Sequence, residues 1–374
     1  MKKYVSLIVL LFLLFFSCEQ GDVGMFYSLE VESEVQDSSL ANNLTIGSMV
    51  KWNNSYYIAS GAVLTRATDG VDWIEIAPPA AGQLCTELAL FDGTVYGCWY
   101  SVDGTASALY TLAADNTWIL VPEMSGYLSA GIVSLADAPV PVLFIITRDD
   151  TYLYTLWYKF SGQAPVAAAI QSSIPMNGAA WANSQYYVIA GNTLYQGPTA
   201  DALTVSLNTP ALAAGSSYNA IASASKSDGS EILFVSTTSG TLFANDGTSW
   251  GAASVSVDVP LYGFSQMSIE DSAGEIKTNL LVGSSMCYYE ILLVDNLDIN
   301  AMVLSKPGIQ TFSTTGINYV NTTLSKGAIR KFFYDDRGTV SAGELGDDLI
   351  FACTAGAGLW INQGNLGYRS WSIE

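Results

Sequence analysis

The strongest constraint on the fold of this chain is a short aromatic and β-branched segment that returns along most of its length. One residue in each copy serves as its anchor: Tyr57, Tyr96, Phe144, Tyr187, Phe234, Leu281 and Phe351. Successive anchors lie 39, 48, 43, 47, 47 and 70 residues apart. A repeat of this length is one supersecondary unit that cannot bury its own hydrophobic faces. Neighbouring units must therefore stack on one another.

The segments around each anchor keep the same order, which predicts the structure of one unit. A strand rich in small residues precedes the anchor, as in 177–182 and 218–224. A short strand follows it, and then an outer strand that often begins with tryptophan. No stretch after the N-terminus has the periodicity of an amphipathic helix. Four antiparallel strands in roughly 40 to 50 residues form one blade of a β-propeller, so we expect an all-β chain of such blades.

The spacing of the anchors predicts seven blades. The interval of 70 residues contains either an insertion or an eighth blade, which is the alternative. Residues 25–374 would form the propeller domain, and residues 25–35 alternate between apolar and polar side chains as a half-exposed strand does. We expect this N-terminal strand to join the terminal blade and close the ring, because closure removes the open sheet edges.

A turn motif recurs before the outer strand. Two copies have the pattern D-G-x-x-W and two are weaker: Asp69, Gly70 and Trp73; Asp246, Gly247 and Trp250; Asp115 and Trp118; and Trp371. This motif resembles the Asp-box, or BNR, turns of sialidase-like and sortilin-like propellers. In that turn the aspartate accepts backbone hydrogen bonds and the tryptophan packs on the blade. The resemblance implies structural turns at the periphery of the blades and indicates no activity.

The N-terminus is typical of an export signal. Lys2 and Lys3 precede an apolar run over residues 4–16, which is too short to span a bilayer comfortably. The following Ser17-Cys18 resembles the lipobox of bacterial lipoproteins, which implies a signal peptide over 1–17, an acylated Cys18 and a tether over 18–24. The protein would then be exported and held on the bacterial cell envelope, at either the periplasmic or the surface face. The alternative is an ordinary cleaved signal in which Cys18 has no role.

Charge and composition exclude several classes of function. The chain has 14 basic and 34 acidic residues, a formal net charge of −20 and no histidine. Nucleic-acid binding is not expected, because a phosphate-binding surface needs clustered Lys and Arg. Histidine-dependent catalytic triads and histidine-ligated metal sites cannot be built. The basic residues that remain are sparse and scattered.

The remaining cysteines, Cys85, Cys98, Cys287 and Cys353, match no metal-binding or redox spacing. After export, a disulfide within the pair Cys85/Cys98 or the pair Cys287/Cys353 is permitted. Buried free thiols are at least as favoured, because cysteine packs well as a small apolar residue.

Catalysis is the less favoured hypothesis. A sialidase needs an arginine cluster that grips a carboxylate, and we do not expect three of the five arginines to converge: Arg66, Arg148, Arg330, Arg337 and Arg369. A two-carboxylate glycosidase stays open as an alternative. An acidic segment offers oxygen ligands for Ca²⁺, although a solvated insertion is preferred: Asp335, Asp336, Glu344, Asp347 and Asp348.

The sequence therefore favours a lipid-anchored envelope propeller that acts as a protein-binding or scaffolding module. Its expected partners are the membrane, through the lipid, and a protein on one face of the ring. The alternatives are a glycan-binding protein, which would expose several aromatic rings in one cleft, and a glycoside-hydrolase-like enzyme. No cofactor is expected apart from the calcium candidate.

Overall fold

A computed structural model gives the fold of most of the chain. It describes residues 40, 44–207, 209–226, 228–253, 257, 259–270, 276–294, 296–305, 312–313, 316–317, 327–335, 349–363 and 371–374. These residues form 29 strands and one short 3-10 helix, η1 (Pro122–Met124). In this described part, no helix has the length and hydropathy needed to cross a bilayer.

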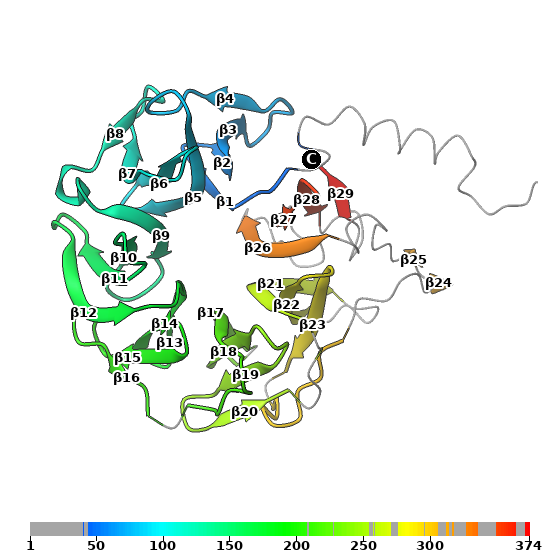
Figure 1. Cartoon of the computed structure of the whole chain (residues 1–374). Coiled ribbons are helices and arrows are strands. Elements are labelled where there is room, and N and C mark those ends of the chain that lie inside the picture. Colours follow the sequence, from blue (N-terminus) through cyan, green and yellow to red (C-terminus); the bar gives the residue numbers. More distant parts are fainter. Residues whose placement is uncertain are drawn as a thin grey trace, which may run out of the picture.

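Of these strands, 27 form seven antiparallel sheets arranged in a ring, a seven-bladed β-propeller (Figure 1). Six sheets have four strands, each taken in order from a continuous stretch of chain. The sixth blade has three described strands and a bridge between Glu290 and Ser305 at its outer edge. The chain begins each blade at the channel and ends it at the periphery. The predicted all-β propeller of four-stranded blades is confirmed.

The strands of the first four blades are β1 (Ser48–Trp52), β2 (Ser55–Ser60), β3 (Ala62–Ala67), β4 (Ile74–Ile76), β5 (Gln83–Phe91), β6 (Thr94–Ser101), β7 (Ser107–Leu112), β8 (Trp118–Leu120), β9 (Leu128–Leu135), β10 (Val142–Arg148), β11 (Tyr154–Phe160), β12 (Val166–Ser172), β13 (Met176–Ala182), β14 (Gln185–Ala190), β15 (Thr193–Gly197) and β16 (Thr204–Val205). Those of the last three are β17 (Tyr218–Ser225), β18 (Glu231–Thr237), β19 (Leu242–Asn245), β20 (Trp250–Ala252), β21 (Leu261–Glu270), β22 (Ile276–Ser284), β23 (Tyr288–Leu293), β26 (Ala328–Asp335), β27 (Leu349–Ala355), β28 (Leu359–Gln363) and β29 (Trp371–Ile373).

The anchors occupy the second strand of every blade, from Tyr57 in β2 to Phe351 in β27. The long interval before the last anchor contains no eighth blade among its described residues. It includes instead the small hairpin of β24 (Phe312–Ser313) and β25 (Gly316–Ile317). The period of the sequence is therefore the period of the blades, and the seven-blade prediction is correct.

The hydrophobic core is divided into layers between the blades. Seven clusters of buried side chains are found in the described residues, one for each pair of neighbouring blades. Phe144 of the third blade, for example, packs with Tyr186 and Val188 of the fourth. Since each layer needs both of its blades, no blade can be stable alone.

The ring closes where the first blade meets the last. The amide of Ile46 donates to the carbonyl oxygen of Thr354 at 2.9 Å, and Lys51 forms an ion pair with Asp335 at 2.6 Å. Arg66 on β3 pairs with Glu374, which follows β29, also at 2.6 Å. The expected closing strand over residues 25–35 lies outside the described residues. Within the described part, the last blade takes all its strands from residues 328–373.

The four described cysteines are buried free thiols, so the disulfide alternatives are wrong. Cys85 faces the core layer between the first and second blades, whereas Cys98 faces the layer between the second and third. Cys287 and Cys353 likewise belong to the layers on opposite sides of the last blade. Burial raises the pKa of Cys353 to about 12, so the thiol is un-ionised and unreactive at neutral pH.

Candidate binding site in the central channel

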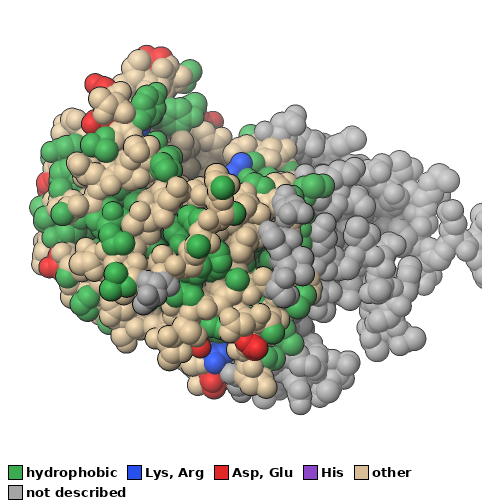
Figure 2. Space-filling view, turned by 60° about the horizontal axis from the view of Figure 1, so that its bottom comes forward, with side chains coloured by type: hydrophobic (Ala, Val, Ile, Leu, Met, Phe, Trp, Pro, Cys, Tyr) green, Lys and Arg blue, Asp and Glu red, His purple; other side chains and the backbone are tan. Residues whose placement is uncertain are grey.

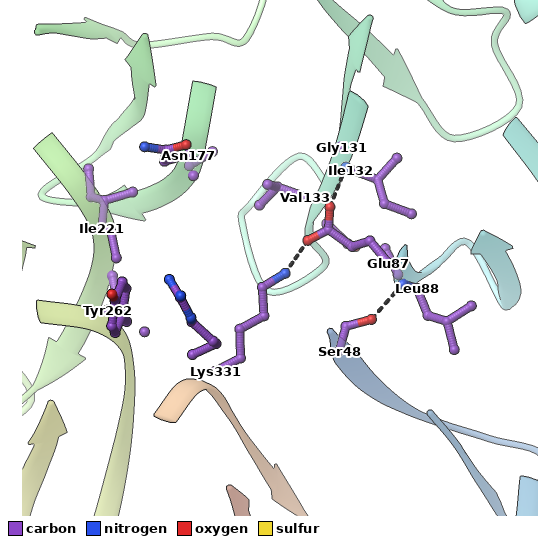
Figure 3. Close-up of a pocket in the computed structure, with 18 of the residues that line it drawn as sticks. Ser48, Glu87, Leu88, Gly131, Ile132, Val133, Asn177, Ile221, Tyr262 and Lys331 are labelled. Carbon is purple, nitrogen blue, oxygen red and sulfur yellow. Dashed lines mark hydrogen bonds and ion pairs between the residues drawn. The ribbon is translucent and has the colours of Figure 1, made fainter. Parts of the chain in front are cut away.

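A cavity of about 690 Å³ lies on the axis of the ring. The inner strands of all seven blades line it: β1, β5, β9, β13, β17, β21 and β26. Every blade begins with its inner strand, so these strands run in the same direction along the channel. Their N-terminal ends therefore meet at one mouth. Polar and charged side chains gather there, and Figure 3 shows several of them around the opening.

One aligned position is shared by every blade. It lies in the inner strand or, in the first blade, directly before it, and in the last five blades it lines the cavity. It lies three residues before the residue that pairs with the anchor of the second strand. In chain order it is occupied by Gly47, Thr86, Ala130, Asn177, Asn219, Tyr262 and Arg330. We call these seven residues the rim. The rim is small in the first three blades and polar or aromatic, with longer side chains, in the last four.

The rim residues stand at β-bulges. In six of the seven blades, the pairing of the first and second strands shifts register at the rim position. The break lies between Tyr218 and Ala220 in the fifth blade, for example, where Asn219 is the extra residue. A bulge bends the strand and redirects a side chain, and bulges are frequent beside binding sites.

Two asparagines of the rim link neighbouring blades. The carboxamide nitrogen of Asn177 donates to the carbonyl oxygen of Tyr218 at 3.4 Å. The carboxamide nitrogen of Asn219 donates in the same way to the carbonyl oxygen of Leu261. Within the described part of the chain, neither carboxamide oxygen accepts a hydrogen bond, so both are available to a ligand that carries donor groups.

An ion pair crosses the channel next to the rim. Lys331 of the last blade reaches Glu87 of the second, and the other carboxylate oxygen of Glu87 accepts the amide of Ile132 at 3.0 Å (Figure 3). Burial lowers the pKa of Lys331, whereas the charge and hydrogen bond of Glu87, together with Cys353 and Cys98, raise it, and the pKa lies above its usual value. Lys331 is therefore charged at neutral pH, and Glu87 balances that charge.

Arg330 supplies the remaining charge at the mouth. Its guanidinium carbon lies 4.1 Å from the ring centroid of Tyr262, and its side chain is exposed. In the described residues, no carboxylate forms an ion pair with it. A guanidinium stacked on an aromatic face keeps its N–H edges free for other acceptors.

The other described arginines do not line this channel. Arg66 stacks over Trp73 at 5.2 Å and pairs with Glu374 at the outer part of the ring closure. Arg148 stacks over Tyr152, 4.8 Å from the ring centroid, at the turn after β10. Arg337 and Arg369 lie outside the described residues. The expectation that the arginines do not converge holds for the three that are described, and Arg330 alone lines the cavity.

The predicted D-G-x-x-W turns all lie between the third and fourth strands of their blades. Asp246 accepts hydrogen bonds from the amides of Thr248 and Ser249, both at 2.9 Å. Asp115 accepts one from the amide of Thr117 at 3.1 Å. No hydrogen bond to the Asp69 carboxylate is found in the described part, and Val71 stands where the other turns have a threonine, so the hydroxyl donor is absent there as well. The assignment to the Asp-box family stays a prediction.

The tryptophans of these turns pack on the blades. Trp118 meets Trp99 edge to face with 5.0 Å between ring centroids. Trp250 and Trp73 are half-buried against their core layers. Trp371 is buried, and its indole N–H donates to the Tyr288 hydroxyl at 3.2 Å. These residues therefore hold the outer strands in place and lie far from the channel.

The aspartate turns give the protein a dependence on acid pH. Burial raises the pKa of Asp246, but its hydrogen bonds with Thr248 and Ser249 lower it by more, so it lies below the usual aspartate value of 3.8. The ionised Asp246 carboxylate therefore contributes to the free energy of unfolding. This contribution is fully present above pH 3.8 and is lost as the pH falls through the folded-state pKa. We expect the Asp246→Asn variant to unfold more easily than wild type at pH 7 and the difference to shrink below pH 3.8, as measured by urea unfolding. A difference that is constant with pH would contradict this account.

One residue of the calcium candidate, Asp335, is described, and its carboxylate already binds other side chains of the protein. Asp335 accepts the Lys51 ammonium at 2.6 Å and the Tyr56 hydroxyl at 2.5 Å. Among the described residues, no group of three or more acidic or cysteine side chains is arranged to hold a metal ion. Asp336, Glu344, Asp347 and Asp348 lie outside them. Asp335 is therefore a structural residue of the ring closure.

Sequence reasoning missed the residues of the channel mouth. Glu87, Lys331 and the long rim residues carry no motif, since they are spread over separate blades. A signal was nevertheless present in the alignment of the repeats on their anchors. One column of that alignment changes from small to polar or aromatic residues partway round the ring.

Comparison with known proteins supports the fold. No protein-family model matches the chain, and no curated protein matches it either. Among solved structures, the BP39L lectin from Burkholderia pseudomallei has a TM-score of 0.51 and 13% identity, over 90% of this chain and 99% of that one. Extracellular domains 1–2 of Drosophila Semaphorin 1a have a TM-score of 0.50 and 9% identity, over 88% of each chain. Likeness at this level of identity shows the fold alone, and that fold is the β-propeller.

Proposed function

We propose that the protein is a non-catalytic binding propeller, exported and held on a membrane surface by an acylated Cys18. The binding role is supported by one observation above others. Of the described residues that line the central cavity, Glu87 is the single carboxylate, and it is engaged by Lys331 and by the amide of Ile132. A glycosidase needs two carboxyl groups on either side of the scissile bond. This cavity therefore suits recognition better than hydrolysis.

The outer surface supports a protein partner. Each of the first four blades exposes an aliphatic side chain on its outer strand, and the fourth strand of the second blade exposes two: Ile74, Ile119, Leu120, Val166 and Val205. Figure 2 shows one face of the molecule with apolar side chains spread between polar ones and few charged groups. Exposed apolar surface with little charge is the composition of a protein-binding face. The glycan alternative has less support, because Arg330 covers one face of Tyr262 at the mouth.

The lipid anchor is tested by replacing its acceptor. We expect Cys18→Ala to abolish incorporation of an alkyne-labelled fatty acid and to release the protein from the membrane fraction, because the acyl chains supply the membrane affinity. Ser17→Ala, which leaves the cysteine in place, is the matched control. Equal labelling of Cys18→Ala and wild type would rule out this anchor.

The binding role is tested by a search for turnover. We expect no hydrolysis of a panel of chromogenic glycosides by the purified full-length protein. Hydrolysis that disappears in Glu87→Gln would show that the channel is catalytic and would overturn the proposal. A separate experiment identifies the protein partner. It compares site-specific crosslinking from Ile119 in intact envelopes with crosslinking from Thr117 in the adjacent turn.

A further inference from the structure

We propose that the mouth of the central channel binds the carboxylate group of a ligand through Arg330, which Tyr262 holds in place. This inference deepens the proposed binding function by naming the chemical group that the propeller recognises. It rests on the rim, on the stacking of Arg330 and on the charges that surround it.

The rim shows which part of the mouth is specialised. Equivalent positions in a repeat protein keep the same residue type where they serve the fold, as the anchors do. The rim instead changes from Gly47, Thr86 and Ala130 to a run of larger polar and aromatic residues in the last four blades. The fold tolerates small residues here, because the first three blades form with them. The asparagine amides and the stack of Arg330 on Tyr262 also link neighbouring blades, but the first three blades form with small residues at this position. The polar groups of the long side chains that these links leave free are available to a ligand.

Arg330 is arranged to receive a planar anion. Its guanidinium lies over the Tyr262 ring, 4.1 Å from the centroid, and the bulge between Ile329 and Lys331 directs it to the mouth. Stacking restricts the side chain before a ligand arrives, which reduces the entropy lost on binding. The guanidinium fork then matches the two oxygens of a carboxylate with two parallel hydrogen bonds.

The charges at the mouth favour an anion. Glu87 balances Lys331, so Arg330 leaves one net positive charge among the described lining residues. The formal charge of the whole chain is −20, but its distant carboxylates are screened beyond a Debye length of about 8 Å at physiological salt. The free carboxamide oxygens of Asn177 and Asn219, on the fourth and fifth blades, are available to donor groups elsewhere on the ligand, such as hydroxyl or amide groups. A cavity of 690 Å³ accommodates a small molecule or the end of a peptide.

The experiment compares matched acids and amides on the full-length protein. Saturation-transfer NMR would use succinate against succinamide, and a short peptide with a free carboxyl terminus against the same peptide amidated. We expect the acids to bind and their amides not to bind. We expect Arg330→Gln to weaken acid binding about ten- to a hundredfold, the usual size for a lost charge-assisted pair. Arg148→Gln is the control, because Arg148 makes the same kind of stack on Tyr152 outside the channel.

The outcomes separate the sources of the carboxylate. Binding of succinate, with or without the peptide acid, shows that a free small carboxylate is sufficient, whereas binding of the peptide acid alone indicates a chain end presented by a protein partner. Either result supports the proposal. No saturation transfer from any acid at millimolar concentration, or equal transfer in Arg330→Gln and wild type, overturns it. Membrane attachment through Cys18 is measured separately, so failure here leaves the proposed anchored module standing.

Discussion

Replacing Gly358 by alanine is expected to lower the free energy of unfolding by about 2–5 kcal/mol. Gly358 has a φ of +77°, which costs an L-residue energy, and an added Cβ would lie 2.1 Å from the carbonyl oxygen of Leu40. That contact is with backbone, so it cannot be relieved by rotation of a side chain. Leu40 is buried in the layer between the last and first blades. The substitution would therefore push the Leu40 backbone away from the last blade and disturb the core layer at the ring closure.

Gly356→Ala is the matched control for this prediction. Gly356 is two residues away with a φ of +81°, but an added Cβ there meets no atom within 4 Å. Gly356→Ala should lower the free energy of unfolding only by the cost of a positive φ at an L-residue, about 1–2 kcal/mol. Chemical denaturation of both variants measures the difference, which isolates the cost of the ring-closing contact. Equal losses would show that the segment around Leu40 is not held tightly against the last blade.

The fold could be predicted from the sequence because its determinants are local and repeated. Tyr57, Phe144 and Phe351 mark the second strand of their blades through nothing more than an aromatic residue within a β-branched run. Each blade repeats this pattern of residues, so one repeat that departs from the pattern does not hide the period. The last interval left an eighth blade open as an alternative, and the ring of seven blades decides for an insertion.

The site could not be predicted in the same way, because its contacts join residues that are distant in the sequence. Glu87 and Lys331 are 244 positions apart, and the ring must close before they meet. Arg330 was considered as one of five arginines, but the sequence alone could not place it beside Tyr262. The bulges that direct these side chains depend on how two strands pair, which the pattern of apolar residues does not specify.

The disulfide alternative failed for a related reason. Cys85 and Cys98 lie on adjacent strands, and their nearness in sequence permits a bond. The bulge between Cys85 and Glu87 shifts the register, and the two thiols enter different core layers. Cysteine here fills space between blades as a small apolar residue does.

Replacing Asp335 by alanine is the second large effect that we expect, a loss of about 3 kcal/mol in the free energy of unfolding. The Asp335 side chain is 3% exposed and accepts hydrogen bonds from the ammonium of Lys51 and the hydroxyl of Tyr56. Its removal leaves two donors of the first blade without this buried acceptor. Lys51 is 34% exposed and can turn to water, which keeps the loss below the upper end of the range for buried pairs.

Two variants and one titration make this prediction specific. Asp228→Ala removes an exposed partner of Lys226, at 3.7 Å, together with hydrogen bonds from Ser230 that are also exposed. It should cost less than Asp335→Ala, because surface ion pairs contribute at most about 1 kcal/mol. Asp335→Asn keeps the shape and one acceptor, so its loss should fall between those of the two alanine variants. The difference in melting temperature between wild type and Asp335→Asn should be the same in the presence of calcium as in the presence of a chelator. If calcium stabilised wild type alone, Asp335 would be a metal ligand after all. Its contact with Lys51 would then be the arrangement that the ion replaces, and the ring closure would depend on calcium.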